Sequence, residues 1–273
     1  MSKYKRIIIG DIHGHWDSFK SIYDYENPDE VIILGDYFDN FHGSDESIME
    51  CFKNLQELQQ KHRADDTKRG DFIMLIGNHD YHYMFFLERY SGFRTSYSIW
   101  AHNTLNEMYD KGLIKYVHVS LVNKVIYSHA GVTNKWLHEN AKFDVCDENL
   151  HYINDMNQFA FRFTYKGGRD FYGTGMSPYS SPIWVRPETF RLDPYVGDGG
   201  VTWTQIFGHT PSNNPQIYKG QFHVDNIQEA IDKNQPNMFM MDCMPNAYLR
   251  ETIDFTTDVI EKRELIKTKD IKL

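Results

Sequence analysis

The stretch YKRIIIGDIHGHWDSF, residues 4–19, decides the fold, because a short aliphatic run ends abruptly there in a glycine and a polar cluster. Runs of this length, rich in isoleucine and stopped by glycine, are typical of buried strands. Asp11, His13 and Asp17 follow the run at once. Since open α/β sheets build their sites beyond the carboxyl ends of strands, we expect Asp11 and His13 to belong to a site.

Four later runs repeat this pattern: VIILGD (residues 31–36), FIMLIGN (72–78), KVIYSHAG (124–131) and QIFGHT (205–210). Apolar residues at helical spacing lie between the first of these runs, over 16–23, over 48–58 behind a Ser44 N-cap, and over 96–112 with Gly112 as the terminating glycine. This alternation predicts an α/β (α+β) fold whose strands are buried on both faces.

The 273 residues suffice for one large domain, and we expect a single domain over residues 1–273. Residues 150–203 are rich in aromatics, glycine and proline and predict a cap or insertion over the site, with aromatic packing favoured over a base-stacking platform. Residues 216–255 predict a run of antiparallel strands, and the highly charged residues 261–273 predict a surface helix or tail.

The composition excludes several classes of protein. A hydrophobic fraction of 41%, a charged fraction of 25% and a net charge of -9 describe an ordinary globular protein, and the acidic balance argues against tight non-specific binding to nucleic acid. The chain start lacks the apolar region of a signal peptide, and no run approaches the roughly 18 apolar residues of a membrane span. We therefore expect a cytoplasmic protein that does not bind membranes.

Six residues whose side chains can bind metal follow the ends of the predicted strands: Asp11, His13, Asp36, Asn78, His129 and His209. Carboxylate, imidazole and amide groups without a thiolate suit two divalent ions, with Mn²⁺ as the first choice and Fe²⁺ or Zn²⁺ as alternatives. We expect Asp36 to bridge the two ions. Asp11 and His13 alternate on one short turn and can serve one ion, whereas the other three residues arrive from later segments for the second.

In chain order, the motifs GDIHG, GDYFDN, GNHD, SHAG and GHT resemble those of the calcineurin-like metallophosphoesterase superfamily. The resemblance is strongest to the branch of the PPP-type serine/threonine phosphatases and the diadenosine tetraphosphate hydrolases, and it covers roughly residues 5–210. It implies two packed mixed β-sheets flanked by helices, the four-layer metallophosphoesterase sandwich. It also implies a binuclear centre and direct attack of a metal-bridging hydroxide on phosphorus.

The resemblance also assigns roles around the metal centre. His79 matches the residue that donates a proton to the leaving oxygen, and Asp39 matches its carboxylate partner. Arg186 resembles the arginine that binds substrate phosphate in this family, and Asn78 is expected to contact phosphate as well as metal. Two of the usual phosphate-binding arginines are replaced, by Asn40 and Ile76, which leaves the substrate class open.

Simpler structural interpretations accompany these assignments. Asp11 alone would suit a helix N-cap, and Arg186 would suit a structural salt bridge. Of the 13 histidines, most, among them His62 and His82, are expected at the surface or in local hydrogen bonds.

The motifs favour a phosphomonoesterase of the protein phosphatase type, acting on a phosphorylated protein. The alternative is a nucleotide pyrophosphate or phosphodiester hydrolase resembling the diadenosine tetraphosphate hydrolases, acting on a small phosphoester or nucleotide. An inactive metal-binding scaffold is the least favoured interpretation, because all six ligand candidates and the acid candidate His79 are present.

Overall fold

The computed structural model describes residues 3–39, 43–87, 93–154, 174–219, 222–223, 229, 231, 238–242 and 244–270. The chain divides into two compact units, which we call unit 1 (Met1–Lys115 with Cys243–Leu273) and unit 2 (Tyr116–Asp242). Unit 2 therefore interrupts unit 1 along the sequence. Each unit contains its own six-stranded mixed sheet.

The sheet of unit 1 has the strand order β12-β11-β1-β2-β3-β4. Its strands are β1 (Lys3–Ile9), β2 (Glu30–Ile33), β3 (Phe72–Leu75), β4 (Ile114–Lys115), β11 (Ala247–Asp254) and β12 (Ile260–Lys267). The first four run parallel, and the last two join antiparallel beside β1. All residues of β2 and β3 are buried, which confirms the aliphatic runs as central strands.

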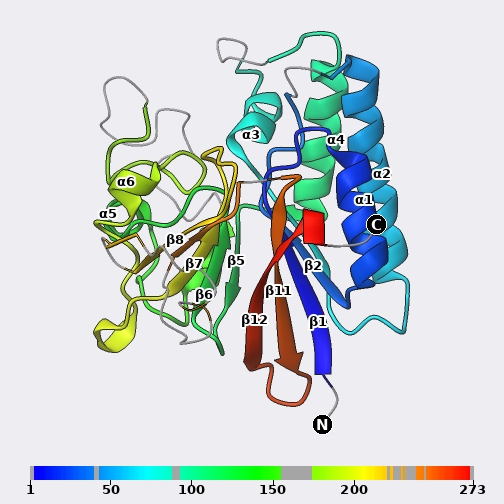
Figure 1. Ribbon diagram of the computed structural model, residues 1–273. Helices are drawn as coiled ribbons and strands as arrows, with labels where there is room; N and C mark the ends of the chain where they lie inside the picture. The colour runs from blue at the N-terminus through cyan, green and yellow to red at the C-terminus, as the bar shows by residue number, and fades with distance from the viewer. Residues whose placement is uncertain are drawn as a thin grey trace. The chain divides into compact units, whose positions relative to one another are not determined.

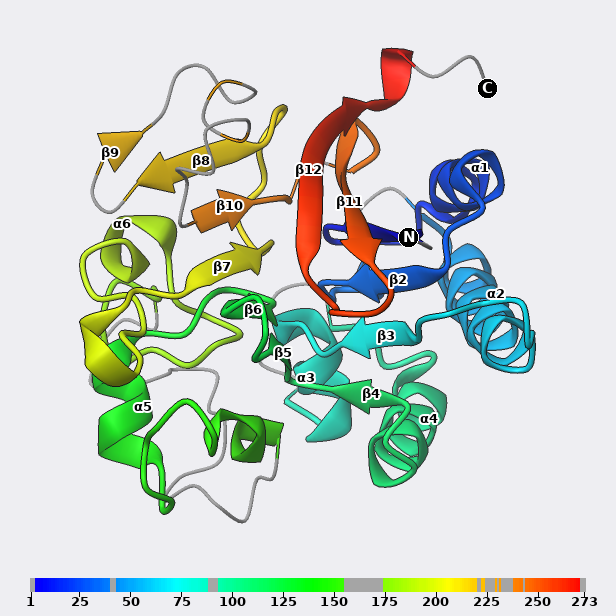
Figure 2. The same ribbon diagram turned by 90° about the horizontal axis from the view of Figure 1, so that it is seen from below.

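The helices of unit 1 are α1 (Trp16–Glu26), α2 (Asp45–Arg63), α3 (Asn78–Met84) and α4 (Ser98–Asp110). Helices α1, α2 and α4 lie along one face of the unit 1 sheet, as Figures 1 and 2 show. Ser44 caps α2 by accepting a hydrogen bond from the Ser47 backbone N–H at 3.2 Å, and Gly112 follows α4 with a φ of 66°. Both helix ends were predicted from the sequence.

The expected surface helix or tail at residues 261–273 is wrong for most of that segment. Residues Ile260–Lys267 form β12, which pairs antiparallel with β11, and a single 3₁₀ turn, Thr268–Asp270, follows. Alternating charges along this segment suggested a solvated helix, but an edge strand with one face towards solvent tolerates the same composition. Pairing with β11 therefore determines the structure of this segment, and the local charge pattern does not.

The sheet of unit 2 has the order β5-β6-β7-β10-β8-β9. Its strands are β5 (Val117–Ser120), β6 (Val125–Ser128), β7 (Thr204–Phe207), β8 (Gln216–Lys219), β9 (Phe222–His223) and β10 (Met238–Met240). Its helices include α5 (Asn134–Asn140), α6 (Pro187–Phe190) and the 3₁₀ segments Leu150–Asn154 and Asp198–Gly200. Helix α6 packs against β7 through the rings of Phe190 and Phe207, whose centroids lie 5.0 Å apart.

The predicted cap or insertion at 150–203 falls partly outside the described residues, since 155–173 are not among them. Its later part, residues 174–203, contributes Val185, Phe190 and Trp203 to the buried interior of unit 2. Among the helices of the described residues, none is both long and apolar enough to cross a bilayer.

A buried ion-pair network crosses the sheet of unit 1. The Arg6 guanidinium donates to Glu30 on β2 at 2.7 Å and to Glu251 on β11 at 3.0 Å, and Arg263 on β12 also pairs with Glu251 at 2.6 Å. Burial raises the pKa of Glu251, but Arg263 and Arg6 lower it by more, so its net pKa lies below the ordinary value of 4.5. The ionised Glu251 therefore stabilises the fold above that pH, and this stabilisation is lost as the pH falls further.

We expect Arg6→Met to lower the free energy of unfolding by about 3–5 kcal/mol, because it leaves buried carboxylates without their partner. Urea unfolding at neutral pH measures this loss. The matched control is Arg63→Met, since Arg63 pairs with Asp71 near the surface, and it should cost less than about 1 kcal/mol. Equal losses in the two variants would contradict the structural role of the buried network.

Candidate metal and acid site

The turn after β1 is bonded directly to the turn after β2. The backbone N–H groups of Ile12 and His13 donate to the carbonyl of Asp36 at 3.1 and 2.8 Å. Asp11 is buried, and α1 begins only at Trp16 with His15 at its N-cap position, so Asp11 is not the helix cap. One oxygen of Asp11 and one of Asp36 lie within 4.8 Å of each other.

Positive backbone φ angles concentrate at the candidate site residues. His13, Asp36, Asp39 and His209 have φ values of 40°, 50°, 65° and 69°, in a region that favours glycine. Such conformations cost about 1–3 kcal/mol each and persist where the surrounding contacts impose them, which is common at functional sites.

The imidazole of His13 is oriented as a metal ligand requires. Its Nδ1 lies 2.7 Å from the Phe38 carbonyl oxygen, which can only accept, so Nδ1 carries the proton. The lone pair is then on Nε2, which lies 3.7 Å from Asp36 Oδ2. A histidine that binds metal usually donates its other ring N–H in this way. This part of unit 1 therefore fits a divalent ion held by Asp11, His13 and Asp36.

The carboxylate of Asp80 fixes the two strand ends that carry Asp36 and Asn78. Its Oδ2 accepts the N–H groups of Asp36 at 2.9 Å and Gly77 at 2.8 Å, and its Oδ1 accepts the N–H of Tyr37 at 2.9 Å. A Cβ on Gly77 would lie 2.0 Å from Asp36 Oδ1, so only glycine fits there. The glycine of the GNHD motif is thus required by its close packing against Asp36.

His79 is hydrogen-bonded to Asp39 and lies directly after Asn78. Its Nδ1 is 2.8 Å from Asp39 Oδ2, and its backbone N–H donates to Asp36 Oδ1 at 2.9 Å. Burial lowers the pKa of His79, but the carboxylates of Asp36 and Asp39 raise it by more, to about 9. The Asp39 bond leaves Nε2 as the ring nitrogen available to substrate.

Two tyrosines hold the other oxygen of Asp39. The hydroxyls of Tyr83 and Tyr97 donate to Asp39 Oδ1 at 2.5 and 3.2 Å. Burial raises the pKa of both phenols, and the charge of Asp39 raises it further, so both remain protonated donors at neutral pH. Asp39 is thereby held in one orientation with respect to His79.

His82 lies in the same cluster and is buried, so it is not at the surface, one of the two places expected for it from the sequence. Atoms of Asp39, His79 and His82 approach within 4.8 Å of one another, a spacing that a metal ion also requires. Burial, and then the charge of His79, lower the pKa of His82 to about 3. Because His79 and the tyrosines already occupy both oxygens of Asp39, we assign this cluster to hydrogen bonding.

In unit 2, His129 and His209 follow directly on neighbouring strands β6 and β7. Their ring centroids lie 5.1 Å apart, both residues are buried, and the Gly208 N–H donates to the His129 carbonyl at 2.7 Å. Trp184 packs edge-on against His209 at 5.2 Å. The two predicted imidazole ligands of this unit are therefore neighbours.

Arg186 lies beside His209 within unit 2. Its Nη1 donates to the His209 carbonyl and to Thr210 Oγ1, both at 3.2 Å, and its Nε donates to the Thr174 carbonyl at 3.4 Å. Among the described residues, no carboxylate pairs with Arg186, which counts against the salt-bridge interpretation there. Its positive charge is therefore placed next to a candidate metal ligand.

All nine predicted site residues lie among the described residues. Unit 1 brings together Asp11, His13, Asp36, Asp39, Asn78 and His79, and unit 2 brings together His129, Arg186 and His209. Asn40 lies outside the described residues, and Ile76 is fully buried. The roles of Asp80, Tyr83 and Tyr97 were not predicted from the sequence. Asp80, at the third position after Gly77, has the spacing of a helix capping box, which was an available signal.

A family model for calcineurin-like phosphoesterases matches residues 4–234. A mutant cold-active protein tyrosine phosphatase is similar in structure, with 15% identity, a TM-score of 0.53, and coverage of 96% of this chain and 80% of that chain. A protein serine/threonine phosphatase from Saccharomyces cerevisiae follows with 12% identity, a TM-score of 0.49, and coverage of 96% and 79%. A protein provisionally named a diadenosine tetraphosphatase has 14% identity, a TM-score of 0.41, and coverage of 97% and 93%. No match was found among curated protein sequences.

Because the family model spans most of its length, the chain belongs to the calcineurin-like phosphoesterase family. It is a metal-dependent phosphoesterase, and its two mixed sheets with flanking helices agree with the fold of that family.

We expect Asp80→Asn to lower the free energy of unfolding by about 1–3 kcal/mol, because an amide has a single oxygen and leaves at least one of three buried N–H groups without an acceptor. Urea unfolding measures the loss. Asp65→Asn is the matched control, since the Asp65 carboxylate accepts hydrogen bonds from the exposed neighbour Thr67, and it should cost less than about 1 kcal/mol. An unchanged stability of Asp80→Asn would refute the fixing role of this carboxylate.

Proposed function

We propose that this enzyme is a phosphomonoesterase of the protein phosphatase type. The observation that carries the proposal is the Asp39–His79 hydrogen bond, at 2.8 Å, directly beside the candidate ligand Asn78. A fixed proton donor next to a metal ligand is what cleavage of an ester with a poor leaving oxygen requires.

The metal ligands proposed are Asp11, His13, Asp36, Asn78, His129 and His209, with Asp36 as the shared carboxylate and Mn²⁺ as the preferred ion. Two divalent ions in such a site lower the pKa of bound water and stabilise negative charge on the phosphoryl oxygens. The donor types support this assignment, because carboxylate, amide and imidazole groups suit Mn²⁺, Fe²⁺ and Zn²⁺.

His79 would hold the transferable proton on Nε2, since its Nδ1 is bonded to Asp39. The charge of Asp36 is the largest of the influences that raise the pKa of His79. A divalent ion held at Asp36 would compensate that charge and so lower the pKa of His79, and a general acid is most effective when its pKa lies near the working pH. Asp39, held by Tyr83 and Tyr97, orients the ring and does not contact substrate.

Arg186 is the proposed phosphate contact, and a guanidinium suits a dianionic monoester well. Asn78 is proposed to contact phosphate as well as metal. The residue before Gly77 is the apolar, fully buried Ile76, so no second cation binds phosphate from that position. Hydrolysis of diesters or nucleotide pyrophosphates is therefore the second candidate function, since those substrates need less positive charge per phosphorus.

A panel of p-nitrophenyl phosphate, bis-p-nitrophenyl phosphate, a phosphopeptide and diadenosine tetraphosphate tests the substrate class on Mn²⁺-loaded enzyme. We expect the monoesters to be hydrolysed fastest and EDTA to abolish turnover. The variant Asp36→Asn should also lose turnover and bind less metal, because a neutral amide does not compensate two dications. Activity that survives verified metal removal would eliminate the proposed mechanism, and faster hydrolysis of diadenosine tetraphosphate would favour the second function.

We expect His79→Asn to lower kcat by roughly 10²–10⁴-fold on an alkyl phosphate while metal content stays normal, because a proton donor is lost. The loss should shrink on p-nitrophenyl phosphate, whose leaving group needs no proton. His138→Asn, the same change at an exposed position of α5, is the control and should leave both rates unchanged. Equal losses on the two substrates would mean that His79 binds phosphate and does not donate a proton.

A further inference from the structure

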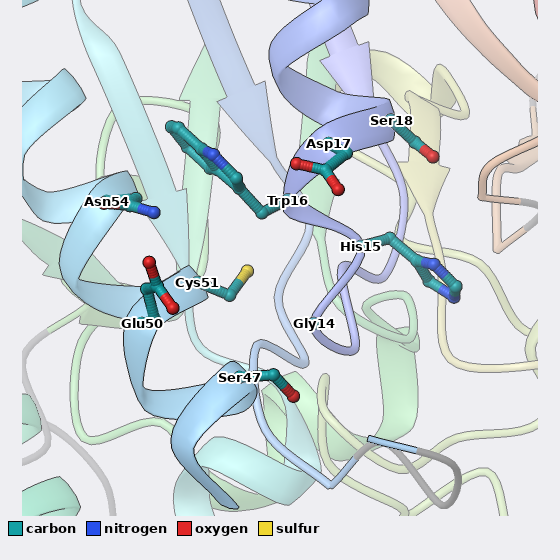
Figure 3. A pocket seen from close by; sticks show the side chains of 9 residues that line it. All are labelled: Gly14, His15, Trp16, Asp17, Ser18, Ser47, Glu50, Cys51 and Asn54. Atoms are coloured by element: carbon teal, nitrogen blue, oxygen red, sulfur yellow. The ribbon is translucent and has the colours of Figure 1, made fainter. Parts of the chain in front are cut away.

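Helices α1 and α2 border a pocket of about 530 Å³ in unit 1, separate from the proposed metal ligands and acid. Its walls include Gly14, Trp16 and Asp17 at the start of α1 and Ser47, Glu50 and Asn54 on α2. The α2 residues are spaced by three and four positions, so they share one face of the helix. Figure 3 shows the Trp16 ring extending from α1 towards α2, where Asn54 and Glu50 lie.

The pocket carries two negative charges that its neighbours do not compensate. Asp17 and Glu50 are exposed, and within the described part of the chain neither carboxylate forms an ion pair or a hydrogen bond. The nearby lysines on these helices are engaged elsewhere. Lys20 pairs with Asp24 at 2.5 Å, and Lys53 lies over the Trp100 ring at 5.5 Å.

The remaining walls favour a planar cation. The Trp16 indole is half-buried, and an aromatic face attracts a guanidinium or ammonium group. The half-buried Asn54 adds an amide oxygen that can accept from such a group. A guanidinium is also the cation that matches carboxylates in a bidentate geometry. A nucleoside polyphosphate would instead bring negative charge towards Asp17 and Glu50, which is unfavourable.

The pocket adjoins the metal-binding turn through the chain itself, because Gly14 directly follows the candidate ligand His13. The Cα atoms of neighbouring residues in a bound peptide are about 3.8 Å apart, so a side chain near the phosphorylated residue is within reach of the pocket. We infer that this pocket binds a basic side chain, arginine above lysine, located within about three residues of the phosphorylated residue of a protein substrate. This inference rests on the proposed function and specifies its substrate class.

The test compares kcat/KM for phosphopeptides that carry arginine or alanine at each of the three positions on either side of the phosphoresidue. We expect kcat/KM to be about tenfold higher with arginine than with alanine at one position. Two exposed charge pairs and one contact with an aromatic ring together contribute an effect of about this size. The double variant Asp17→Asn/Glu50→Gln should lose this preference. Asp24→Asn/Glu57→Gln makes the same charge change on the same helices outside the pocket and should keep it, and both variants should hydrolyse p-nitrophenyl phosphate normally.

A second measurement does not depend on activity. The indole N–H resonance of Trp16, assigned with Trp16→Phe, should shift in NMR spectra when the arginine peptide is added and stay unchanged with the alanine peptide. Equal kcat/KM values for the two peptides, or a preference that survives Asp17→Asn/Glu50→Gln, would overturn the inference while the proposed function stands. If no phosphopeptide is hydrolysed, the proposed function fails. If the Trp16 resonance also stays unshifted with the arginine peptide, the inference that the pocket binds a basic side chain is overturned as well.

Discussion

The carboxylate of Asp80 is the contact on which the edge of unit 1 that carries the candidate site residues depends. It binds three backbone N–H groups, two after β2 and one after β3, and so fixes the segments that carry Asp36 and Asn78 relative to each other. These bonds also offset the cost of a positive φ at Asp36. Gly77 belongs to the same arrangement, because any side chain there would displace Asp36. The positions of the candidate ligands Asp36 and Asn78 are therefore set by backbone hydrogen bonds.

The proposed acid, His79, is constrained in a different way, through side chains. Asp39 is fully buried and shares its oxygens between His79 and two tyrosines, whereas the side chain of His79 is 17% exposed. The Nδ1 atom of the ring is thus held by a carboxylate that is itself fixed on both oxygens. Such an arrangement limits the reorganisation needed for proton transfer, which is how preorganised polar groups accelerate reactions.

Local sequence patterns were sufficient to predict the buried strands β1, β2, β3, β6 and β7 and the helices α1, α2 and α4, because strand ends and caps depend on residues close in the chain. The six candidate metal ligands were proposed from the ends of those strands. The partners of these residues were not predictable in the same way. Tyr97 contacts Asp39 across 58 positions, and β12 is a strand only because β11 lies beside it. Long-range contacts of this kind leave no periodic signal, so the tyrosine network and the last strand were missed.

The interrupted sequence of unit 1 has a consequence for biosynthesis. Strand β1 pairs with β2 on one side and with β11 on the other, and β11 begins only at Ala247. At a ribosomal rate of about 5–20 residues per second, β1 waits roughly 12–50 s for this second partner. During that time the nascent chain presents an open sheet edge, and Arg6 lacks the Glu251 carboxylate. The sheet of unit 1 is therefore completed only after the whole of unit 2 has been synthesised, and until then the emerging polypeptide is exposed to aggregation at this edge.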